Sequence, residues 1–484
     1  MKNKAFPLIA FFLVACSGPV IPSATLEDPP EIFPDYRDVT VPENIAPLNF
    51  SCPDAEPVML LVEGRRLKGK NGLFSFGKRF WKTLMKKDDI ELTVVACRDG
   101  VWTAYAPFKI FISHDRIDPY LSYRLIPPGY QGWQEMGLYQ RNLESYRQTA
   151  ILENRLTGKN CLNCHTTCER DPSRFVFHAR ADFGGTVLAD GDRLEKLNTK
   201  TDSTISALVY PWWHPSGKYI AFSANKTMQA FFNHDPNRIE VYDQASDVVV
   251  YNVEDHQIFW SPLTKAADRF ETFPTFSPEG RELYFCSAEA VDSMPEQYSK
   301  AKYGLYRIAF DPEHGSFGDS SEVVYDAPAD SMSVSFPRIS PDGRHLCFTR
   351  HSYGNFSIWH KDADLWMIDL QSGRRWPLDA LNSRDVESFH SWSGNSRWLV
   401  FSSRRDDGLY TRLYLAHIDE DGQASKPFLM PQRNPERYYK DLMVSYNLPG
   451  FMTGKVLVSS RKLATLLRNS AETQVQPARC QKPF

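Results

Sequence analysis

The residues best suited to chemistry form the run Cys161-Leu162-Asn163-Cys164-His165. Two thiols at this spacing can add to the two vinyl groups of a porphyrin, and the adjacent imidazole can then bind the iron as its proximal ligand. Because the chain has only 9 Cys and 12 His in 484 residues, chance gives an expectation of about 0.004 such runs. The run therefore predicts a covalently bound haem c held by Cys161, Cys164 and His165.

The sixth ligand of such an iron and the role of a third cysteine stay open. His178 is the next histidine along the chain and the first candidate for the distal position. Further candidates are Met228, Met332 and His214, and a five-coordinate iron is an alternative. Cys168 adds a third thiol, and because thiolates and imidazole suit zinc, a zinc site is the alternative cofactor. A disulfide or structural cysteines without a metal make the third alternative.

The N-terminus predicts the compartment in which this chemistry would take place. Lys2 and Lys4 precede an apolar run from Ala5 to Ala15, which is too short to span a bilayer of roughly 30 Å but suits a secretory signal. The run ends Leu13-Val14-Ala15-Cys16 and resembles the lipobox of bacterial lipoproteins, which implies cleavage before Cys16 and a lipid on its thiol. The residue after it is not Asp, so the resemblance implies an outer-membrane anchor, on the periplasmic or surface side; an ordinary signal peptide is the alternative.

Composition limits the class of protein. Hydrophobic residues make up 42% and charged residues 24% of the chain, so it is not mostly disordered. Lys+Arg 56 against Asp+Glu 59 leaves a net charge of −3, which does not favour nucleic-acid binding. Aromatic residues reach 13% and Pro 33 outnumbers Gly 26, a profile that favours short strands and turns over helical bundles. After the signal, no segment approaches 18 consecutive apolar residues, so no membrane-spanning helix is predicted.

A repeat organises most of the chain. Residues 210–223, 273–286 and 336–349 each begin with an aromatic-Pro pair and contain a Pro-x-Gly turn followed by an apolar strand pattern. Residues 389–402 form a degraded copy, and weaker copies lie near residues 175–197 and 442–458. Further strands follow each turn, as at residues 304–308 and 322–325, which gives four strands per unit. Four-stranded units that cannot bury both faces alone are typical of propeller blades.

These repeats resemble the WD40-like PD repeats of the TolB-type β-propeller family, and the whole chain resembles the Bacteroidetes-type exported propeller lipoproteins. The resemblance covers roughly residues 165 to 460 and implies six blades. We therefore expect an all-β fold, a six-bladed TolB-like propeller preceded by a small β-sandwich-like domain and a connecting helix.

The predicted domains follow from these patterns. A lipoprotein signal peptide (1–16) and a proline-rich tether (17–45) come first. A small β-rich domain (46–125) is predicted from apolar runs at 58–62, 90–96 and 108–112, with Cys52 and Cys97 able to bridge it. A helical connector (126–160) is predicted because residues 134–154 lack proline. The propeller (161–460), with the haem-type motif at its start, and a C-terminal tail (461–484) complete the chain.

Two functions compete. In the first, the exported and lipid-anchored propeller carries haem c and passes electrons to an envelope partner, or uses the haem as part of a binding scaffold. In the second, the propeller is a non-enzymatic scaffold that binds a protein or a glycan, and Cys161, Cys164 and Cys168 are structural. No convergent set of acid, base and nucleophile is visible, and no Gly-x-Ser-x-Gly motif occurs, so an enzymatic role is not favoured.

Overall fold

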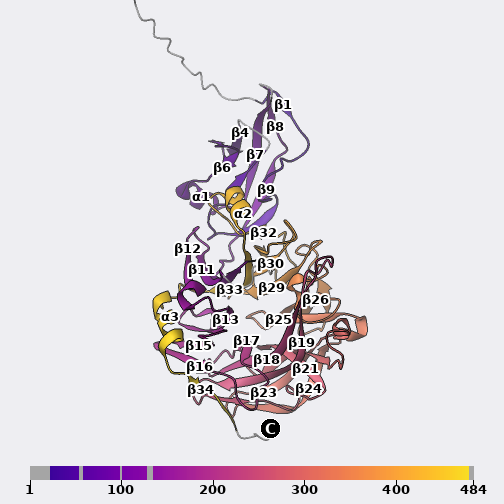
Figure 1. Cartoon of the computed structure of the whole chain (residues 1–484). Coiled ribbons are helices and arrows are strands. Elements are labelled where there is room, and N and C mark those ends of the chain that lie inside the picture. The colour runs from indigo at the N-terminus through magenta and orange to yellow at the C-terminus, as the bar shows by residue number, and fades with distance from the viewer. Residues whose placement is uncertain (1–21, 54–57, 99–100, 128–134, 479–484) are drawn as a thin grey trace, which may run out of the picture.

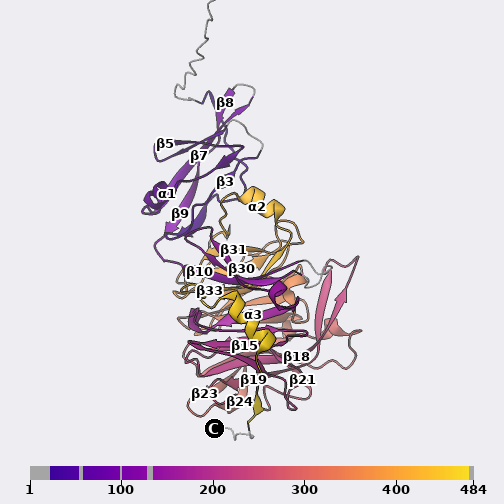
Figure 2. The same ribbon diagram turned by 60° about the vertical axis from the view of Figure 1, so that its left-hand side comes forward.

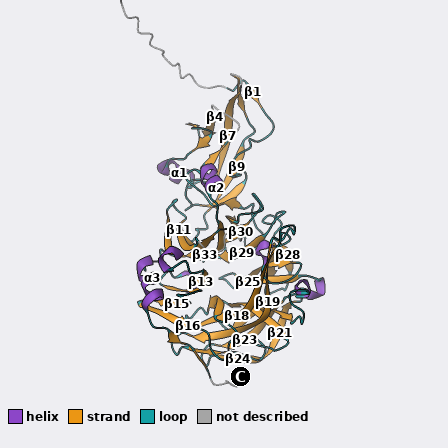
Figure 3. Cartoon of the chain, in the orientation of Figure 1, coloured by secondary structure: helices purple, strands orange, loops and turns teal. Residues whose placement is uncertain are grey.

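The computed structural model describes residues 22–53, 58–98, 101–127 and 135–478. Strands dominate these residues, and the few helices lie at the periphery (Figure 3). The predicted signal peptide and the predicted lipid anchor at Cys16 lie outside the described residues. Within the described ranges, no helix is both long and apolar enough to cross a bilayer.

The first part of the chain forms a β-rich domain at one end of the molecule (Figure 1). Its main sheet has the strand order β1-β8-β7-β4-β5, with β9 paired to β7 and β2 paired to β9. The elements of this domain are β1 (Ala24–Thr25), β2 (Val39–Pro42), β3 (Phe50–Ser51), β4 (Val58–Val62), β5 (Arg65–Lys68), β6 (Leu73–Phe74), α1 (Lys78–Leu84), β7 (Asp89–Arg98), β8 (Val101–Ala104) and β9 (Phe108–Ser113). The strands predicted in residues 58–62, 90–96 and 108–112 are confirmed as parts of β4, β7 and β9.

The structure differs from the expected tether and also bears on Cys52 and Cys97. Residues 22–45, predicted as part of an extended tether, contribute β1 and β2 to the sheet, and Tyr36 and Val41 are fully buried. Proline is tolerated there because both strands are short and pair in parallel at the margins of the sheet, where few backbone donors are needed. Cys97 carries a free thiol, so the bridge that the sequence left open between Cys52 and Cys97 is not formed.

Six further sheets make up the larger part of the molecule. Five follow one another along the chain: β13 (Leu162–Thr167), β14 (Arg174–Ala179), β15 (Gly185–Asp190) and β16 (Arg193–Asn198); β17 (Leu208–Trp213), β18 (Tyr219–Phe231), β19 (Ile239–Asn252) and β20 (Gln257–Phe259); β21 (Arg269–Phe276), β22 (Glu282–Glu289), β23 (Gly304–Asp311) and β24 (Ser316–Tyr325); β25 (Ser333–Ile339), β26 (His345–His351), β27 (Asp364–Asp369) and β28 (Arg375–Pro377); β29 (Glu387–Trp392), β30 (Trp398–Ser403), β31 (Arg412–His417) and β32 (Phe428–Leu429). The sixth joins β33 (Ser445–Met452) to β10 (Tyr120–Ile126), β11 (Gly137–Asn142) and β12 (Gln148–Glu153). Short 3-10 helices lie in the connections: η2 (Asn154–Thr157), η3 (Cys168–Arg170), η4 (Tyr298–Lys300), η5 (Pro328–Asp330) and η6 (Ser357–Trp359).

The first strands of these sheets close into a ring. Contacts run in the order β33, β13, β17, β21, β25, β29 and back to β33. Figure 1 shows the sheets arranged around a common centre, with these strands nearest to it. Sheets that radiate from a central channel in this way form a β-propeller. Because β33 pairs with β10, a strand from near each end of the chain joins in one sheet and closes the ring.

The predicted helix at residues 134–154 is wrong, because the described part of this segment holds β11 and β12. Absence of proline permits a helix but does not require one. Residues 137–142 pair with β10 in an unbroken antiparallel register, and Leu138 and Leu152 are buried by that pairing. Tertiary pairing therefore overrides local helix propensity here, and the propeller includes residues from 120 onward.

The C-terminal segment is also more ordered than a tail. It contains α3 (Ser460–Asn469), whose Leu463 and Leu467 are fully buried, followed by β34 (Thr473–Gln474) and β35 (Gln476–Pro477). The two short strands pair in parallel with β16 and β20, the outer strands of two neighbouring sheets. In Figure 2, α3 lies along the outside of the propeller beside β15. The described part of the predicted C-terminal tail (461–484) therefore contains ordered elements packed on the propeller.

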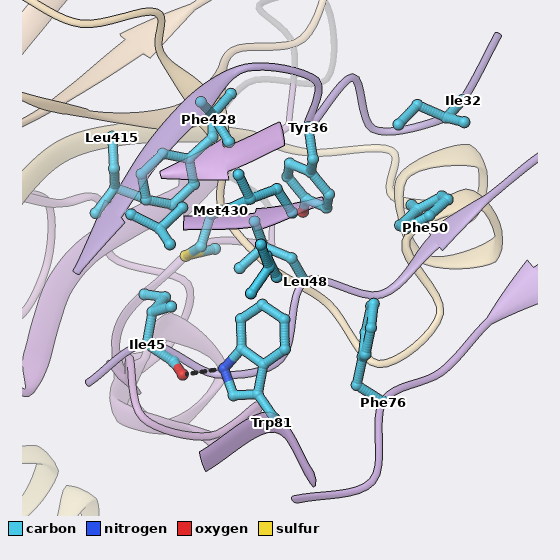
Figure 4. Packing of buried hydrophobic residues seen from close by; sticks show 14 of the residues in the cluster. Ile32, Tyr36, Ile45, Leu48, Phe50, Phe76, Trp81, Leu415, Phe428 and Met430 are labelled. Atoms are coloured by element: carbon cyan, nitrogen blue, oxygen red, sulfur yellow. Dashed lines mark hydrogen bonds between the residues drawn. The ribbon is translucent and has the colours of Figure 1, made fainter. Parts of the chain in front are cut away.

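The N-terminal domain and the propeller share one hydrophobic core. Figure 4 shows Tyr36, Leu48 and Trp81 facing Phe428 and Met430 of the sheet β29–β32 and the chain that follows it. The Tyr36 hydroxyl donates to the carbonyl of Leu429 at 3.1 Å, and Trp81 Nε1 donates to the carbonyl of Ile45 at 2.9 Å. The helix α2 (Pro435–Asp441) lies at the same junction (Figure 1). Buried contact of this kind fixes the domain against the propeller.

Candidate binding site in the central channel

Each strand of the inner ring carries the same local distortion. Six residues occupy the left-handed backbone region with φ between 49° and 53°: Cys164, Tyr210, Phe273, Phe336, Phe389 and Leu448. The antiparallel register with the neighbouring strand shifts at each of these places. A positive φ is costly for residues other than glycine, so its recurrence at six matched positions marks a bulge that belongs to the architecture.

The bulges place a plug of side chains across the channel. Ring centroids lie 4.7 Å apart for Tyr210 and Phe273, 4.0 Å for Phe273 and Phe336, and 4.9 Å for Phe336 and Phe389. Phe273 and Phe336 are each only 1% exposed. The aromatic residue of the sequence repeat therefore closes the channel at mid-height and contributes packing energy between sheets.

The plug divides the channel into two cavities. The wide cavity, about 340 Å³, lies where the inner strands begin. Its lining includes Arg124, Asn163, Tyr210, Asn225, Phe231, Ile239, Val241, Trp359, Arg404 and Asn447. The narrow cavity, about 140 Å³, lies where the inner strands end. Its lining includes His165, Arg170, Trp212, Arg338, His390 and Trp392.

The Cys-x-x-Cys-His run lies on the first inner strand, β13, and shares the repeat. Cys164 occupies the bulge position that aromatic residues or Leu448 occupy in the other five strands. His165 then matches the proline that follows the bulge in four of those strands, as in Tyr210-Pro211. Cys164 is 3% exposed, and burial raises the pKa of its thiol. Structurally, the motif is thus one copy of a repeated inner-strand segment.

This placement does not fit a covalently bound haem c. Cys161 lines the wide cavity, whereas Cys164 and His165 line the narrow cavity beyond the plug. One porphyrin must reach both thiols and the imidazole together, and the aromatic plug lies between the two cavities. The narrow cavity next to His165, about 140 Å³, is also below the roughly 300 Å³ of the smallest pockets that hold drug-sized ligands. As placed in this structure, the residues therefore do not fit a single haem.

His165 and His178 both lie in the interior of the propeller, and each has its own surroundings. Neither ring nitrogen of His165 has a hydrogen-bond partner among the described residues, and burial lowers the pKa of His165 to about 4. His178, on β14, pairs with Asn163 across the strands, and its Nδ1 lies 3.0 Å from Thr186 Oγ1. Burial lowers the pKa of His178 to about 3. Both imidazoles are therefore neutral at neutral pH.

The other ligand sets expected for this segment are not assembled. Over residues 22–53, 58–98, 101–127 and 135–478, no group of three or more His, Cys, Asp or Glu side chains could hold a metal ion. Cys161, Cys164 and Cys168 carry free thiols, so no disulfide links them. Cys168 is buried in η3, where burial raises the pKa of its thiol to about 11. In the structure these cysteines pack as small apolar side chains.

The alternative distal ligands lie elsewhere. His214 bonds through Nε2 to the carbonyl of Gly280 at 2.9 Å and lies 2.7 Å from Ser216 Oγ through Nδ1, so it secures a turn between sheets. Met228 is 41% exposed on the long hairpin of β18 and β19. Met332 is partly buried against the core between the third and fourth consecutive sheets.

The wide cavity has a polar, positively charged floor that the sequence did not suggest. Arg124, on β10, is 8% exposed; its Nη1 donates to Asn163 Oδ1, and its Nε has no partner among the described residues. Arg404, after β30, is 3% exposed and donates to the carbonyls of Leu409 and Ile358. Neither guanidinium has a carboxylate within 4.0 Å in the part of the chain that the structure describes. The sequence could not reveal this pair of arginines, because Arg124 lies in a segment that was predicted to precede the propeller.

The mouth of the wide cavity is apolar and is extended by a long hairpin. β18 and β19 have 13 and 14 residues, against 6 to 8 in the second strands of the other consecutive sheets. Their outer halves project beyond the other sheets (Figure 2). Phe231, Ile239 and Val241 from this hairpin line the cavity, and Phe231 is 51% exposed. The cavity thus combines a cationic floor with an apolar wall.

The known proteins that resemble this chain do so only distantly. No protein-family model matches the sequence, and no curated protein matches it. Among solved structures, TolB from Acinetobacter baumannii is similar over 78% of this chain and 85% of its own, at 13% identity and a TM-score of 0.43. Prolyl oligopeptidase B from Galerina marginata is similar over 62% of this chain and 41% of its own, at 11% identity and a TM-score of 0.35. Dipeptidyl peptidase 4 from Porphyromonas gingivalis is similar over 82% of this chain and 60% of its own, at 11% identity and a TM-score of 0.31. The propeller assignment itself rests on the strand topology above.

Proposed function

We propose that this chain is a six-bladed β-propeller of the TolB type that acts as a non-enzymatic binding protein in the cell envelope, exported and anchored through a lipid on Cys16. Each of the six radial sheets is one blade, and the domain of β1–β9 is a separate module that holds the propeller at a fixed angle. The partner is an envelope protein or a glycan, and it binds at the wide end of the channel.

One observation carries this proposal: the central channel is closed at mid-height by Tyr210, Phe273, Phe336 and Phe389, so its wide end forms a blind cavity and not a passage. A concave, mostly apolar cavity with a few convergent polar groups is the usual form of a binding site in proteins. The long hairpin of β18 and β19 enlarges this end alone among the consecutive sheets, and its exposed Phe231 supplies an apolar contact at the rim.

A photo-crosslinking experiment tests the proposal. A photoreactive amino acid replaces Phe231 at the cavity mouth, or Val323 on the outer strand β24 as a matched control; the two side chains are 51% and 57% exposed. In cells that export the chain, we expect a discrete crosslinked product at position 231 and none at position 323. Equal crosslinking at both positions would show that the wide end is not a recognition surface.

The haem prediction has its own test. Purified chain, produced together with a haem-attachment system, is examined by visible absorption and by peroxidase staining after denaturation. Because Cys161 and His165 open to different cavities, we expect a colourless protein. A Soret band that survives denaturation would refute the binding-scaffold proposal in favour of electron transfer through Cys161, Cys164 and His165.

A further inference from the structure

The charge balance of the wide cavity indicates the chemistry of its ligand. Arg124 and Arg404 are both more than nine-tenths buried and lack an ion-pair partner among the described residues. A buried cation is costly unless an anion pairs with it. Asp243, a buried acid of the long hairpin, already accepts from other donors: Asn225 at 2.9 Å, Asn355 at 2.6 Å and Tyr303 at 3.4 Å. The floor therefore has positive charge that the described chain leaves unpaired.

Two contacts hold the guanidinium of Arg124 in place. Arg124 Nη1 bonds to Asn163, and Nη2 lies 3.2 Å from the amide oxygen of Asn447 once that amide is oriented to satisfy its neighbours. These two contacts fix the plane of the guanidinium and leave Nε as the donor without a partner. Arg180 also lines the cavity and has no ion pair in the described residues. An anionic group in this cavity would lie among the positive charges of Arg124, Arg180 and Arg404, which all line it.

The apolar wall of the cavity indicates the chemistry of the part of the ligand that lies beyond its anionic group. Phe231, Ile239 and Val241 line one side, and Phe356, Ile358 and Trp359 line another. A small inorganic anion would leave this apolar wall in contact with water, whereas an apolar chain attached to the anion would cover it. At about 340 Å³ the cavity is within the roughly 300 to 1,000 Å³ of pockets for small organic ligands.

We propose that the wide cavity binds a fatty-acid-like ligand, a monocarboxylate on an apolar chain, with the carboxylate paired to the positive charge of the Arg124 guanidinium and the chain running past Val241 to Phe231 at the mouth. This inference rests on the proposed role of the channel as a binding site and specifies a small ligand at its floor. Arg404, whose guanidinium lies 3.4 Å from the ring centroid of Trp359, contributes charge from the opposite wall without changing its own contacts.

Isothermal titration of the purified full chain with three probes of equal chain length tests the inference: octanoate, 1-octanol and octylamine. A hydrogen bond to a charged group contributes about 1.5 to 3 kcal/mol, which corresponds to a preference for octanoate over 1-octanol of about 10- to 150-fold. Octylamine is expected not to bind. Equal affinity for octanoate and 1-octanol would overturn the proposal, and so would tighter binding of an N-acetylated tri-leucine peptide than of octanoate, which would mark a peptide site.

Variants locate the carboxylate. Arg124→Gln is expected to weaken octanoate binding at least tenfold while leaving 1-octanol binding unchanged, and retained octanoate affinity in this variant would refute the placement. If Arg124→Gln does not fold, two measurements still test the proposal: the octanoate affinity of Arg180→Gln, a substitution at an exposed arginine, and the preference of the wild-type chain for octanoate over 1-octanol.

Phe231→Ser should weaken the binding of neutral and anionic probes alike, whereas Val323→Ser, on β24, should change neither. Crosslinking at position 231 in the absence of octanoate binding would contradict the ligand assignment alone and leave the proposed function standing.

Discussion

The carboxyl of Asp243 provides a quantitative test of how completely water is excluded from the long hairpin of β18 and β19 around this residue. Asp243 is 2% exposed, and burial raises its pKa from 3.8 to about 7, although hydrogen bonds from Asn225 and Asn355 act in the opposite direction. Because the folded state holds its proton more tightly than the unfolded state, stability from this group is greatest at low pH. It declines as the pH rises from about 4 to about 7 and is constant above that range.

The substitution Asp243→Asn keeps the shape of the side chain and removes this titration. A pKa of about 7 in the folded chain and 3.8 in the unfolded chain makes the wild type lose about 3 kcal/mol between pH 5 and pH 8 through this group. The variant should therefore gain about 3 kcal/mol relative to the wild type over that interval. Other groups also titrate there, among them Glu271, whose pKa burial raises to about 8, but they cancel in the difference between the two proteins.

Urea unfolding followed by tryptophan fluorescence at pH 5 and pH 8 measures the effect, with refolding checked at both values. Asp421→Asn is the matched control, because the Asp421 side chain is 81% exposed; its stability difference from the wild type should stay within about 0.5 kcal/mol at both pH values. If the Asp243→Asn and wild-type curves shift in parallel, with a difference below about 1 kcal/mol between pH 5 and pH 8, the carboxyl is solvated and the reasoning fails.

Three further predictions concern the plug, the bulge and the C-terminal strands. Phe336→Ala removes a ring that contacts Phe273 and Phe389; it should lower the free energy of unfolding by about 3 to 5 kcal/mol in urea titration, and a loss below 1 kcal/mol would show a loosely packed plug. Cys164→Ala should cost about 1 kcal/mol and leave the visible spectrum unchanged, since the thiol only packs in the plug layer; loss of a coloured band would contradict this. Truncation after Asn469 removes β34 and β35 from the edges of β16 and β20; it should lower the melting temperature and increase aggregation measured by light scattering, and an unchanged melting temperature would show that these pairings carry no stability.

The repeated part of the propeller was predictable because its information is local. Each copy contains a turn such as Ser340-Pro341-Asp342-Gly343, in which Gly343 has φ 73°, and a following strand with alternating apolar residues. The sheet that closes the ring was not predictable in this way. Its strand β33 pairs with β10 across more than 300 residues. No local pattern in residues 120–153 identifies β33 as the strand with which this segment pairs.

The tether and the connector were misjudged for the same physical reason. Proline content and absence of proline describe what a free segment prefers, and both segments are bound to other strands. Val41 is fully buried in a parallel pairing with β9, and Leu152 is fully buried in β12 beside β11. In both cases the energy of burial and pairing exceeds the local preference. The two arginines were missed because Arg124 and Arg404 are far apart in sequence and line the same cavity only once the ring is closed.

The Cys-x-x-Cys-His motif shows how a strong local signal can be outweighed by the geometry of its element. Attachment of one porphyrin needs two thiols and an imidazole that project toward a common space. β13 runs along the channel past the bulge at Cys164, so Cys161 borders the wide cavity while His165 borders the narrow one. The other five inner strands carry the same bulge without any cysteine at that position, which means that the bulge arises from propeller packing and not from a cofactor. Cys164 is buried in the layer of the plug, where a thiol serves as a small apolar side chain.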